Sequence, residues 1–489
     1  MTTLAAAVGL SRQWSLPFGR LATLSGMAAG LILGLLADQH GILSPEAAWR
    51  GLRASQILFG ATPSLRSLGY DLPPLPTLLE LPLAVLPGLR STPVPGSIVA
   101  GAAAVIAALS LLTLLRGLGL AAWLSAGLVA AALLHPLTLY GVATGSGDVL
   151  GVALLLVGVR FLLDWVRTSN SIPLVAAAFA IGFAGLARYD LVVVAATLTA
   201  VVAMLTGPAP GQRLAFAIAF GTPAAAILGL WLVLNALATG NPLTFAAEQY
   251  TTALAAPATT PHTQSWILST FGPFLLMAPA VVPALLGAVA ACSRRAARPA
   301  LVLVMPIVTV PLAAMAGTLV GRAPVGLMDA LPLVWLSGAL LGAVLPRWSA
   351  LALPLVALGA AGAVAPILSL LESPMWRPER DLAATIRKES TGRDVLVDDR
   401  RDVLPVFLTG EPAHFVAPAD PDFGSISSNP RGRVRLVLVH SPAGDGLGPS
   451  QQTWPRVAAG EIPWAELVGE WPVSGQPTER YRLFRVRAG

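Results

Sequence analysis

Long apolar runs separated by short polar connections make up most of the chain, from residue 21 to residue 371. Each run holds about 18 residues or more, the length at which an α-helix crosses a hydrocarbon layer of roughly 30 Å. The pattern therefore predicts an all-α polytopic membrane bundle of about 11 transmembrane helices. The expected spans are residues 21–37, 97–115, 119–138, 147–165, 172–188, 190–206, 214–237, 266–292, 300–320, 328–345 and 349–370.

One long connection interrupts the apolar runs near the start of the chain. Residues 38–96 are rich in proline and only patchily apolar. Within them, the amphipathic stretch 45–53 is expected to form a helix that lies along the membrane interface. We therefore expect a transmembrane domain over residues 1–371 that carries a large outer loop at 38–96.

The last part of the chain, residues 372–489, is polar by comparison. A helix is expected at 379–388, and the loops between the predicted strands are rich in Pro, Gly and Ser. These features indicate a small C-terminal α/β domain. Its strands are expected at 395–398, 414–416, 434–439 and 481–486.

The composition agrees with a membrane protein and excludes several other classes. Hydrophobic residues make up 55% of the chain and charged residues 11%, and the mean hydropathy is +0.72. A single cysteine, Cys292, excludes an intrachain disulfide and a cysteine-based metal cluster. The net charge of +6 arises in the apolar part, without a basic patch interleaved with aromatic residues, so nucleic acid is not an expected partner.

The arginines of the short connections predict the orientation. Arg12 and Arg20 precede the first span, which lacks a convincing cleavage site and is therefore read as an uncleaved span. With the N-terminus cytoplasmic, ten arginines fall in inner connections and six in outer ones, as the positive-inside rule expects. An odd number of spans then places the C-terminal domain on the extracytoplasmic side of the cell membrane.

Acidic residues are few in the membrane part and unevenly placed. Only nine occur in residues 1–371, and eight of these fall on the outer side, with Asp164 alone on the inner side. Carboxylates are costly near a bilayer, so their gathering on one face predicts a polar site there. The eight are Asp38, Glu46, Asp71, Glu80, Asp148, Asp190, Glu248 and Asp329.

Three of these carboxylates stand out by position. Asp38 follows the first span, Asp71 precedes the paired prolines of the outer loop, and Asp148 opens a later span. Each also has a simpler interpretation: Asp38 and Asp71 mark the water interface, and Asp148 caps a helix. Glu46 and Glu80 are expected to be interfacial.

Further polar residues lie in the outer turns. The Arg188-Tyr189-Asp190 turn interrupts a long apolar stretch, and a local Arg–Asp ion pair is its simplest reading. The polar loop 239–265 contains Glu248 and His262; its length and polarity suit a cover over a site, and a merely flexible loop is the alternative. Arg322 and Asp329 flank a later turn. In the C-terminal domain, Asp398-Asp399 beside two arginines indicates a self-paired turn rather than a metal site.

Together these residues suit a substrate with an anionic headgroup and a hydrophobic tail. A guanidinium binds phosphate with two parallel hydrogen bonds. A carboxylate near an acceptor hydroxyl acts as a general base.

The order of the motifs resembles the GT-C superfamily of membrane glycosyltransferases, including its protein mannosyltransferase-like and aminoarabinose transferase-like members. The resemblance covers about residues 20–345 and lies in the ordered set, since each motif alone is degenerate. Gln39 stands where many members have a second acid, and Leu72 stands where they have histidine. The matching residues are Asp38, Asp71-Leu72-Pro73-Pro74-Leu75, Asp148, Arg188-Tyr189-Asp190 and Gly240-Asn241-Pro242-Leu243.

The resemblance implies a donor and a mechanism. A polyprenyl-phosphate sugar would give its sugar to a lipid, glycan or protein acceptor at the outer face, with inversion and with Asp38 as general base. Asp71 and Asp148 would orient hydroxyls. The substrate would also contact Arg188, Tyr189, Asp190, Glu248, His262 and Arg322. No cofactor is certain, and a divalent metal is left open.

Two other classes compete with this interpretation. The changed residues around Asp38 and Asp71 favour a catalytically inactive relative that scaffolds or regulates a cell-envelope assembly complex. A transporter is disfavoured, because the sequence has no internal repeat and its main intramembrane charge, Arg160, lies close enough to the inner end to reach water.

Overall fold

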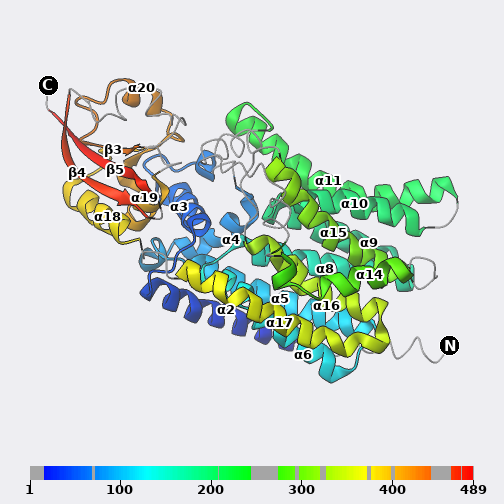
Figure 1. The fold of residues 1–489 in the computed structure, drawn as a ribbon. Helices are drawn as coiled ribbons and strands as arrows, with labels where there is room; N and C mark the ends of the chain where they lie inside the picture. The colour runs from blue at the N-terminus through cyan, green and yellow to red at the C-terminus, as the bar shows by residue number, and fades with distance from the viewer. Residues whose placement is uncertain are drawn as a thin grey trace.

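The structure is a computed structural model in which a bundle of apolar helices carries a small domain at one end (Figure 1). The structure describes residues 16–68, 72–206, 209–243, 272, 274–291, 297–319, 327–371, 376–397, 402–441, 464–474 and 476–487.

Helices occupy the described part of every expected span. Six are long and apolar enough to cross a membrane, and α6 with α7, bent by 50° at His135, would make a seventh. Four further apolar helices have 10–17 residues. The bundle consists of α2 (Leu16–Gln39), α5 (Val94–Gly117), α6 (Ala122–Leu133), α7 (Pro136–Ala143), α8 (Gly147–Thr168), α9 (Ser171–Ala187), α10 (Leu191–Leu205), α11 (Pro210–Thr239), α14 (Val281–Ala291), α15 (Ala297–Leu319), α16 (Leu331–Val344) and α17 (Ala352–Leu371).

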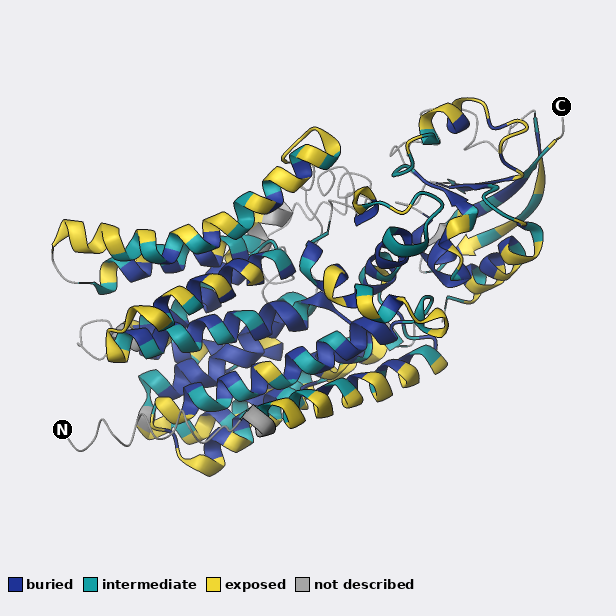
Figure 2. Ribbon diagram, turned by 180° about the vertical axis from the view of Figure 1, so that it is seen from behind, coloured by how far each residue is buried: buried dark blue, intermediate teal, exposed yellow. Residues whose placement is uncertain are grey.

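Small residues allow the first two long helices to pack closely. An added Cβ at Gly30 of α2 would lie 2.1 Å from the carbonyl oxygen of Ser97 in α5, and one at Gly101 of α5 would lie 2.2 Å from that of Gly26. Close approach through small residues is how membrane helices gain contact area without a hydrophobic driving force. The outer faces of α2 and α11 stay exposed, as expected of lipid-facing surfaces (Figure 2).

The segment 38–96, which we call the outer loop, contains several short helices. It contains α3 (Pro45–Phe59), the 3₁₀ helix η1 (Leu65–Leu68), α4 (Pro74–Ala84) and the 3₁₀ helix η2 (Pro87–Leu89). The Ser44 hydroxyl accepts a hydrogen bond from the backbone N–H of Ala47 and so caps α3. Two further 3₁₀ helices flank α16, η3 (Leu327–Ala330) and η4 (Pro346–Leu351).

In the described residues of the C-terminal domain, five strands form one sheet in the order β2-β1-β3-β5-β4. β1 pairs in parallel with β2 and β3, whereas β5 pairs antiparallel with β3 and β4. The expected helix and four expected strands are present, and the sequence patterns missed β4. The elements are α18 (Arg377–Glu389), β1 (Val395–Leu396), α19 (Val403–Thr409), η5 (Pro412–His414), β2 (Phe415–Val416), α20 (Phe423–Ser428), β3 (Leu436–Ser441), β4 (Ala465–Val473) and β5 (Gln476–Val486).

The interfacial position expected for 45–53 is wrong. Leu43, Ala48 and Leu52 are buried in one apolar cluster with residues of the C-terminal domain. The indole N–H of Trp376 also donates to the Leu43 carbonyl at 3.2 Å. The helix is amphipathic because one face packs on this domain and the other is polar.

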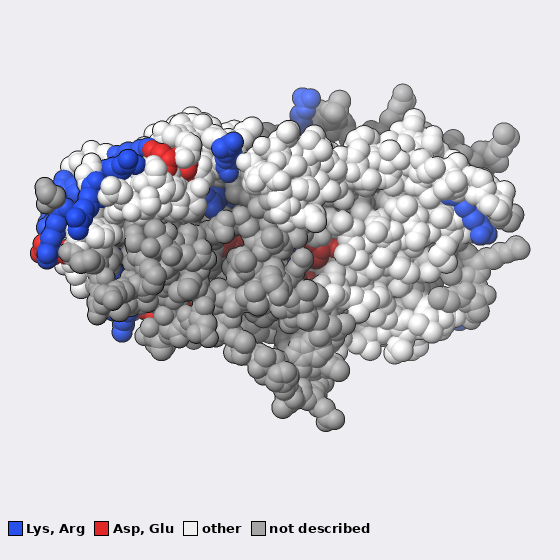
Figure 3. All heavy atoms as spheres, turned by 90° about the horizontal axis from the view of Figure 1, so that it is seen from above, with Lys and Arg blue, Asp and Glu red and all other residues white. Residues whose placement is uncertain are grey.

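The charged residues are unevenly distributed over the molecule. The face of the bundle in Figure 3 carries few charged residues, and most of the blue and red spheres lie on the C-terminal domain. Asp148 begins α8 and Asp164 lies near its other end, between Arg160 and Arg167. The two carboxylates are thus about 24 Å apart along the helix.

Candidate functional site

Arg188 lies at the centre of a buried ionic cluster. It ends α9 with an extended backbone, and Asp190 begins α10 two residues later. The Arg188 side chain is 5% exposed. Its aliphatic stem crosses α8 at Gly151, where an added Cβ would lie 2.8 Å from both Cγ and Cδ of Arg188.

Three carboxylates from different elements converge on this guanidinium. Nη1 of Arg188 lies 2.8 Å from Asp148 at the start of α8, and Nη2 lies 2.8 Å from Asp329 in η3. Asp190 accepts from both Nε, at 3.0 Å, and Nη2, at 2.9 Å. The local Arg–Asp ion pair expected from the sequence is therefore present, but it is one part of a larger cluster.

The Arg188 guanidinium has no N–H group to spare. A fifth hydrogen bond runs from its Nη1 to the carbonyl of Met328 at 3.4 Å, and a guanidinium has five N–H donors in all. Phosphate binding by Arg188 would require an exchange of partners. One cation facing three carboxylates also leaves this cluster with a formal charge of −2.

The turn before α8 fixes Asp148. Ser146, and not Asp148, caps the helix, and its hydroxyl donates to Oδ2 of Asp148 at 2.7 Å. Gly145 has φ +71°, the left-handed region that favours glycine. The helix-cap interpretation of Asp148 is thus wrong, since its carboxylate binds Ser146 and Arg188 instead.

A second ionic cluster, which the sequence patterns missed, borders the same turn. Arg50 of α3 hydrogen-bonds to Glu46, its Nε lies 3.4 Å from Oε1 of Glu80, and its Nη2 donates to the Gly145 carbonyl at 2.5 Å. Arg50 is 1% exposed and Glu80 is 3% exposed. The interfacial position expected for Glu80 is therefore wrong.

Burial raises the pKa of Glu80 to about 7, against the opposing effect of the Arg50 cation. The i,i+4 spacing of Glu46 and Arg50 was the one signal in the sequence that pointed to an ion pair. The participation of Glu80 depends on how α4 packs on α3, which no local pattern encodes.

Tyr189 has a different role from its neighbours. Its hydroxyl donates to the carbonyl of Leu72 at 2.9 Å and accepts from the indole N–H of Trp231 in α11 at 3.1 Å. The residue therefore joins the outer loop to α11, beside the paired prolines.

Asp38 lies outside the Arg188 cluster. It is half-buried at the end of α2, and the charged group acting on it is Arg380 of α18 in the C-terminal domain. Within the described residues no hydrogen bond or ion pair joins Asp38 to Asp148 or Arg188. Four other predicted site residues lie outside the described residues: Asp71, Glu248, His262 and Arg322.

In the described ranges no group of three or more His, Cys, Asp or Glu side chains could hold a metal ion. The three aspartates that do converge are arranged around a guanidinium, which already supplies a compensating positive charge.

The sequence of the chain matches no protein-family model and no curated protein sequence. Its structure does have counterparts. Residues amounting to 95% of the chain superpose on 97% of the aminoarabinose transferase ArnT from Cupriavidus metallidurans bound to undecaprenyl phosphate, with a TM-score of 0.56 and 14% identity.

Two further structures were matched, and only the first of them has a TM-score above 0.5. The apo form of that transferase matches 98% of both chains with a TM-score of 0.53 and 14% identity. The Archaeoglobus fulgidus oligosaccharyltransferase, in complex with zinc and sulfate, matches 85% of this chain and 67% of its own, with a TM-score of 0.44 and 12% identity. This multi-pass membrane protein therefore has the GT-C fold.

Proposed function

We propose that this protein is an integral membrane glycosyltransferase that moves a sugar from a polyprenyl-phosphate donor to a lipid, glycan or protein acceptor. The observation that carries the proposal is the match, over 95% of the chain, to a transferase whose structure holds undecaprenyl phosphate. The buried ionic cluster around Arg188, at the ends of bundle helices, supports it, because ionisable residues in membrane segments are costly and generally mark functional sites.

The reaction is a single displacement in which Asp38 acts as general base. The acceptor hydroxyl gives its proton to the Asp38 carboxylate while its oxygen bonds to the anomeric carbon. The bond from that carbon to the phosphate oxygen breaks, and the lipid phosphate leaves with the electron pair from the opposite face, inverting the centre. The half-buried position of Asp38, beside the C-terminal domain, supports this role.

The other residues divide into two groups. Arg322 and His262 bind the phosphate and stabilise the charge that grows on it. Arg188 holds Asp148, Asp190 and Asp329, whose remaining oxygens orient sugar or acceptor hydroxyls, with Asp71 and Glu248 contributing from the outer segments. This division follows from the five hydrogen bonds that already occupy Arg188.

The proposed orientation puts the N-terminus in the cytoplasm and the site at the outer face. The positive-inside distribution of arginines supports it. The C-terminal domain, which α3 connects to the turn before Asp148, would recognise the acceptor.

Binding of the lipid gives a test that does not require the acceptor to be known. Purified protein in detergent should bind undecaprenyl phosphate at least about tenfold more tightly than undecaprenol, since the phosphate makes charge-assisted hydrogen bonds. Native mass spectrometry measures both affinities. Equal affinities would show that the protein does not recognise the phosphate and would contradict the proposal.

A second candidate is a catalytically inactive relative that scaffolds or regulates an envelope-assembly complex. The observation that favours it is the separation of Asp38 from the Arg188 cluster within the described residues. Such a protein would keep the lipid-binding fold but transfer no sugar from any labelled polyprenyl-phosphate donor.

A further inference from the structure

The helix α3 has two faces that contact different parts of the molecule. On one face, Ala48 and Leu52 are buried in the core of the C-terminal domain, and Phe407 of α19 packs on Gly51, where an added Cβ would lie 2.5 Å from its ring. Glu46 and Arg50 project from the opposite face, since residues four apart lie on one side of a helix. The helix therefore bridges the C-terminal domain and the bundle.

On the bundle side, Arg50 packs against the turn that carries Asp148. Its guanidinium donates to the Gly145 carbonyl, and an added Cβ at Gly147 would lie 2.7 Å from its Nη1. An added Cβ at Gly96 of α5 would likewise lie 3.2 Å from Oε1 of Glu80 and 2.9 Å from the Gly145 carbonyl oxygen. A side chain larger than glycine at either position would therefore clash with these charged groups or with the Gly145 backbone.

The C-terminal end of the same turn, at Asp148, contacts the Arg188 cluster. Ser146 donates to Asp148, and Asp148 binds Arg188. A movement of the Gly145 carbonyl would therefore move the carboxylate of Asp148 relative to Arg188. The two ionic clusters are linked through the four consecutive residues Gly145–Asp148.

A buried ionic cluster is a poor way to gain stability alone. Removing two charges from water is expensive, and apolar residues of similar size often stabilise a core as well or better. The hydrogen bond from Arg50 to a backbone carbonyl does what an apolar side chain cannot, because it fixes the position of that carbonyl.

We propose that Arg50, together with Glu46 and Glu80, is a positioning group for the transfer site: it fixes the Gly145–Asp148 turn and couples that turn to the C-terminal domain through α3. The inference rests on the proposed function for the chemistry that the turn serves. Arg50 does not itself touch the reacting atoms in this account.

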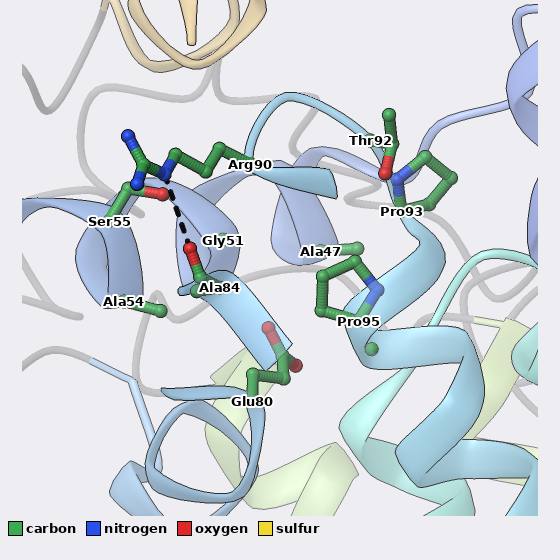
Figure 4. Close-up of a pocket in the computed structure, with 11 residues that line it drawn as sticks. Ala47, Gly51, Ala54, Ser55, Glu80, Ala84, Arg90, Thr92, Pro93 and Pro95 are labelled. Atoms are coloured by element: carbon green, nitrogen blue, oxygen red, sulfur yellow. Dashed lines mark hydrogen bonds between the residues drawn. The ribbon is translucent and has the colours of Figure 1, made fainter. Parts of the chain in front are cut away.

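Glu80 gives the arrangement a pH dependence. The charged groups that act on it are Arg50 and Glu46, both from α3. Arg90, from the segment after η2, lines the same small cavity but donates to the Ala84 carbonyl, and α5 contributes Pro95 and Gly96 there (Figure 4). Because the pKa of Glu80 is raised to about 7, its ion pair with Arg50 forms only as the pH rises through that value. Turn order and transfer rate should then increase together.

The test compares four variants of the full-length protein in lipid nanodiscs by hydrogen–deuterium exchange. Arg50→Leu should speed exchange of the amides in residues 145–150 by about tenfold or more, from the loss of a charge-assisted hydrogen bond. Arg50→Lys keeps the positive charge but lacks the planar guanidinium, and its amides should exchange at an intermediate rate. The double variant Arg50→Leu/Glu80→Leu should regain thermal stability without regaining slow exchange. Arg53→Leu, on the same helix, is the matched control, because Arg53 donates to Gln56 within α3.

Transfer kinetics add a readout that a purely structural role would not change. Arg50→Leu should lower kcat at least about tenfold with little change in the donor KM, and Glu80→Gln should remove the acid limb of the rate profile near pH 7. Unchanged exchange at 145–150 in a folded Arg50→Leu or double variant would overturn the inference. If the wild-type protein transfers no sugar but the exchange pattern appears, the proposed function fails while the coupling of Arg50 to the turn stands.

Discussion

Arg188 shows how far a single residue can be understood from its neighbours in the sequence. The Arg188-Tyr189-Asp190 turn was recognisable because it interrupts an apolar stretch, and its local ion pair is present. Asp148 and Asp329 lie 40 and 141 residues away from Arg188. Their convergence depends on the packing of α8 and η3, which local sequence patterns do not encode.

The first prediction concerns the charge balance of this cluster. Arg188→Leu leaves three carboxylates without their cation and should destabilise the protein by about 3–5 kcal/mol. Thermal unfolding in detergent measures the loss. Arg116→Leu, at an exposed position at the end of α5, should change stability by no more than about 0.5 kcal/mol. A similar small change in both variants would contradict the role given to Arg188.

The second prediction concerns the glycine beneath Arg188. Gly151→Ala places a methyl group 2.8 Å from the Arg188 stem, which five hydrogen bonds hold in place, and should cost about 1–3 kcal/mol. Gly229→Ala in α11 is the matched control, because an added Cβ there meets no atom within 4 Å. Equal melting temperatures for the two variants would show that the stem moves freely.

A third prediction follows from the titration of Glu80. The folded protein holds the Glu80 proton with a pKa of about 7, against an ordinary value of 4.5, so the folded state binds that proton more tightly. The free energy of unfolding should fall by up to about 3 kcal/mol as the pH rises from about 4.5 to about 7. Glu80→Gln should flatten this slope in thermal unfolding at several pH values. The same slope in wild type and variant would contradict the raised pKa.

At the scale of elements, the membrane helices were predictable and the outer loop was not. Apolar length identifies a helix because the lipid requires every backbone polar group to be satisfied within the segment. The amphipathic pattern of residues 45–53 fits a helix at the membrane interface and equally fits a helix that packs on another domain. Leu43, Ala48 and Leu52 pack with a domain more than 300 residues away, so sequence alone could not distinguish the two.

The packing of α2 on α5 gives a prediction at this scale. Gly30→Ala would bring its Cβ to 2.1 Å from a backbone oxygen of α5, so the helices must separate, at a cost of about 1–3 kcal/mol. Gly19→Ala lies on the same helix with no atom within 4 Å of the added Cβ and should leave thermal unfolding unchanged. Identical behaviour of both variants would show that α2 is not tightly packed at Gly30.

At the scale of the whole molecule, the fold and the order of the motifs point the same way. The expected bundle with a small C-terminal α/β domain is present, and the structure matches a transferase with undecaprenyl phosphate bound. The roles of Asp38, Asp71, Glu248, His262 and Arg322 stay predictions. The full second ionic cluster, by contrast, depends on the packing of α3 against α4 and the turn before α8.

The central claim is sugar transfer, and its most direct measurement is a transfer assay. Purified protein in nanodiscs is given a panel of labelled undecaprenyl-phosphate sugars together with an envelope lipid and glycan extract as acceptor. We expect release of undecaprenyl phosphate and an inverted glycosidic bond with one donor, and at least a hundredfold slower rate for Asp38→Asn, as loss of a general base costs about 10²–10⁴-fold. Transfer at an unchanged rate in Asp38→Asn would contradict the role of Asp38, and no transfer from any donor would contradict the enzyme itself.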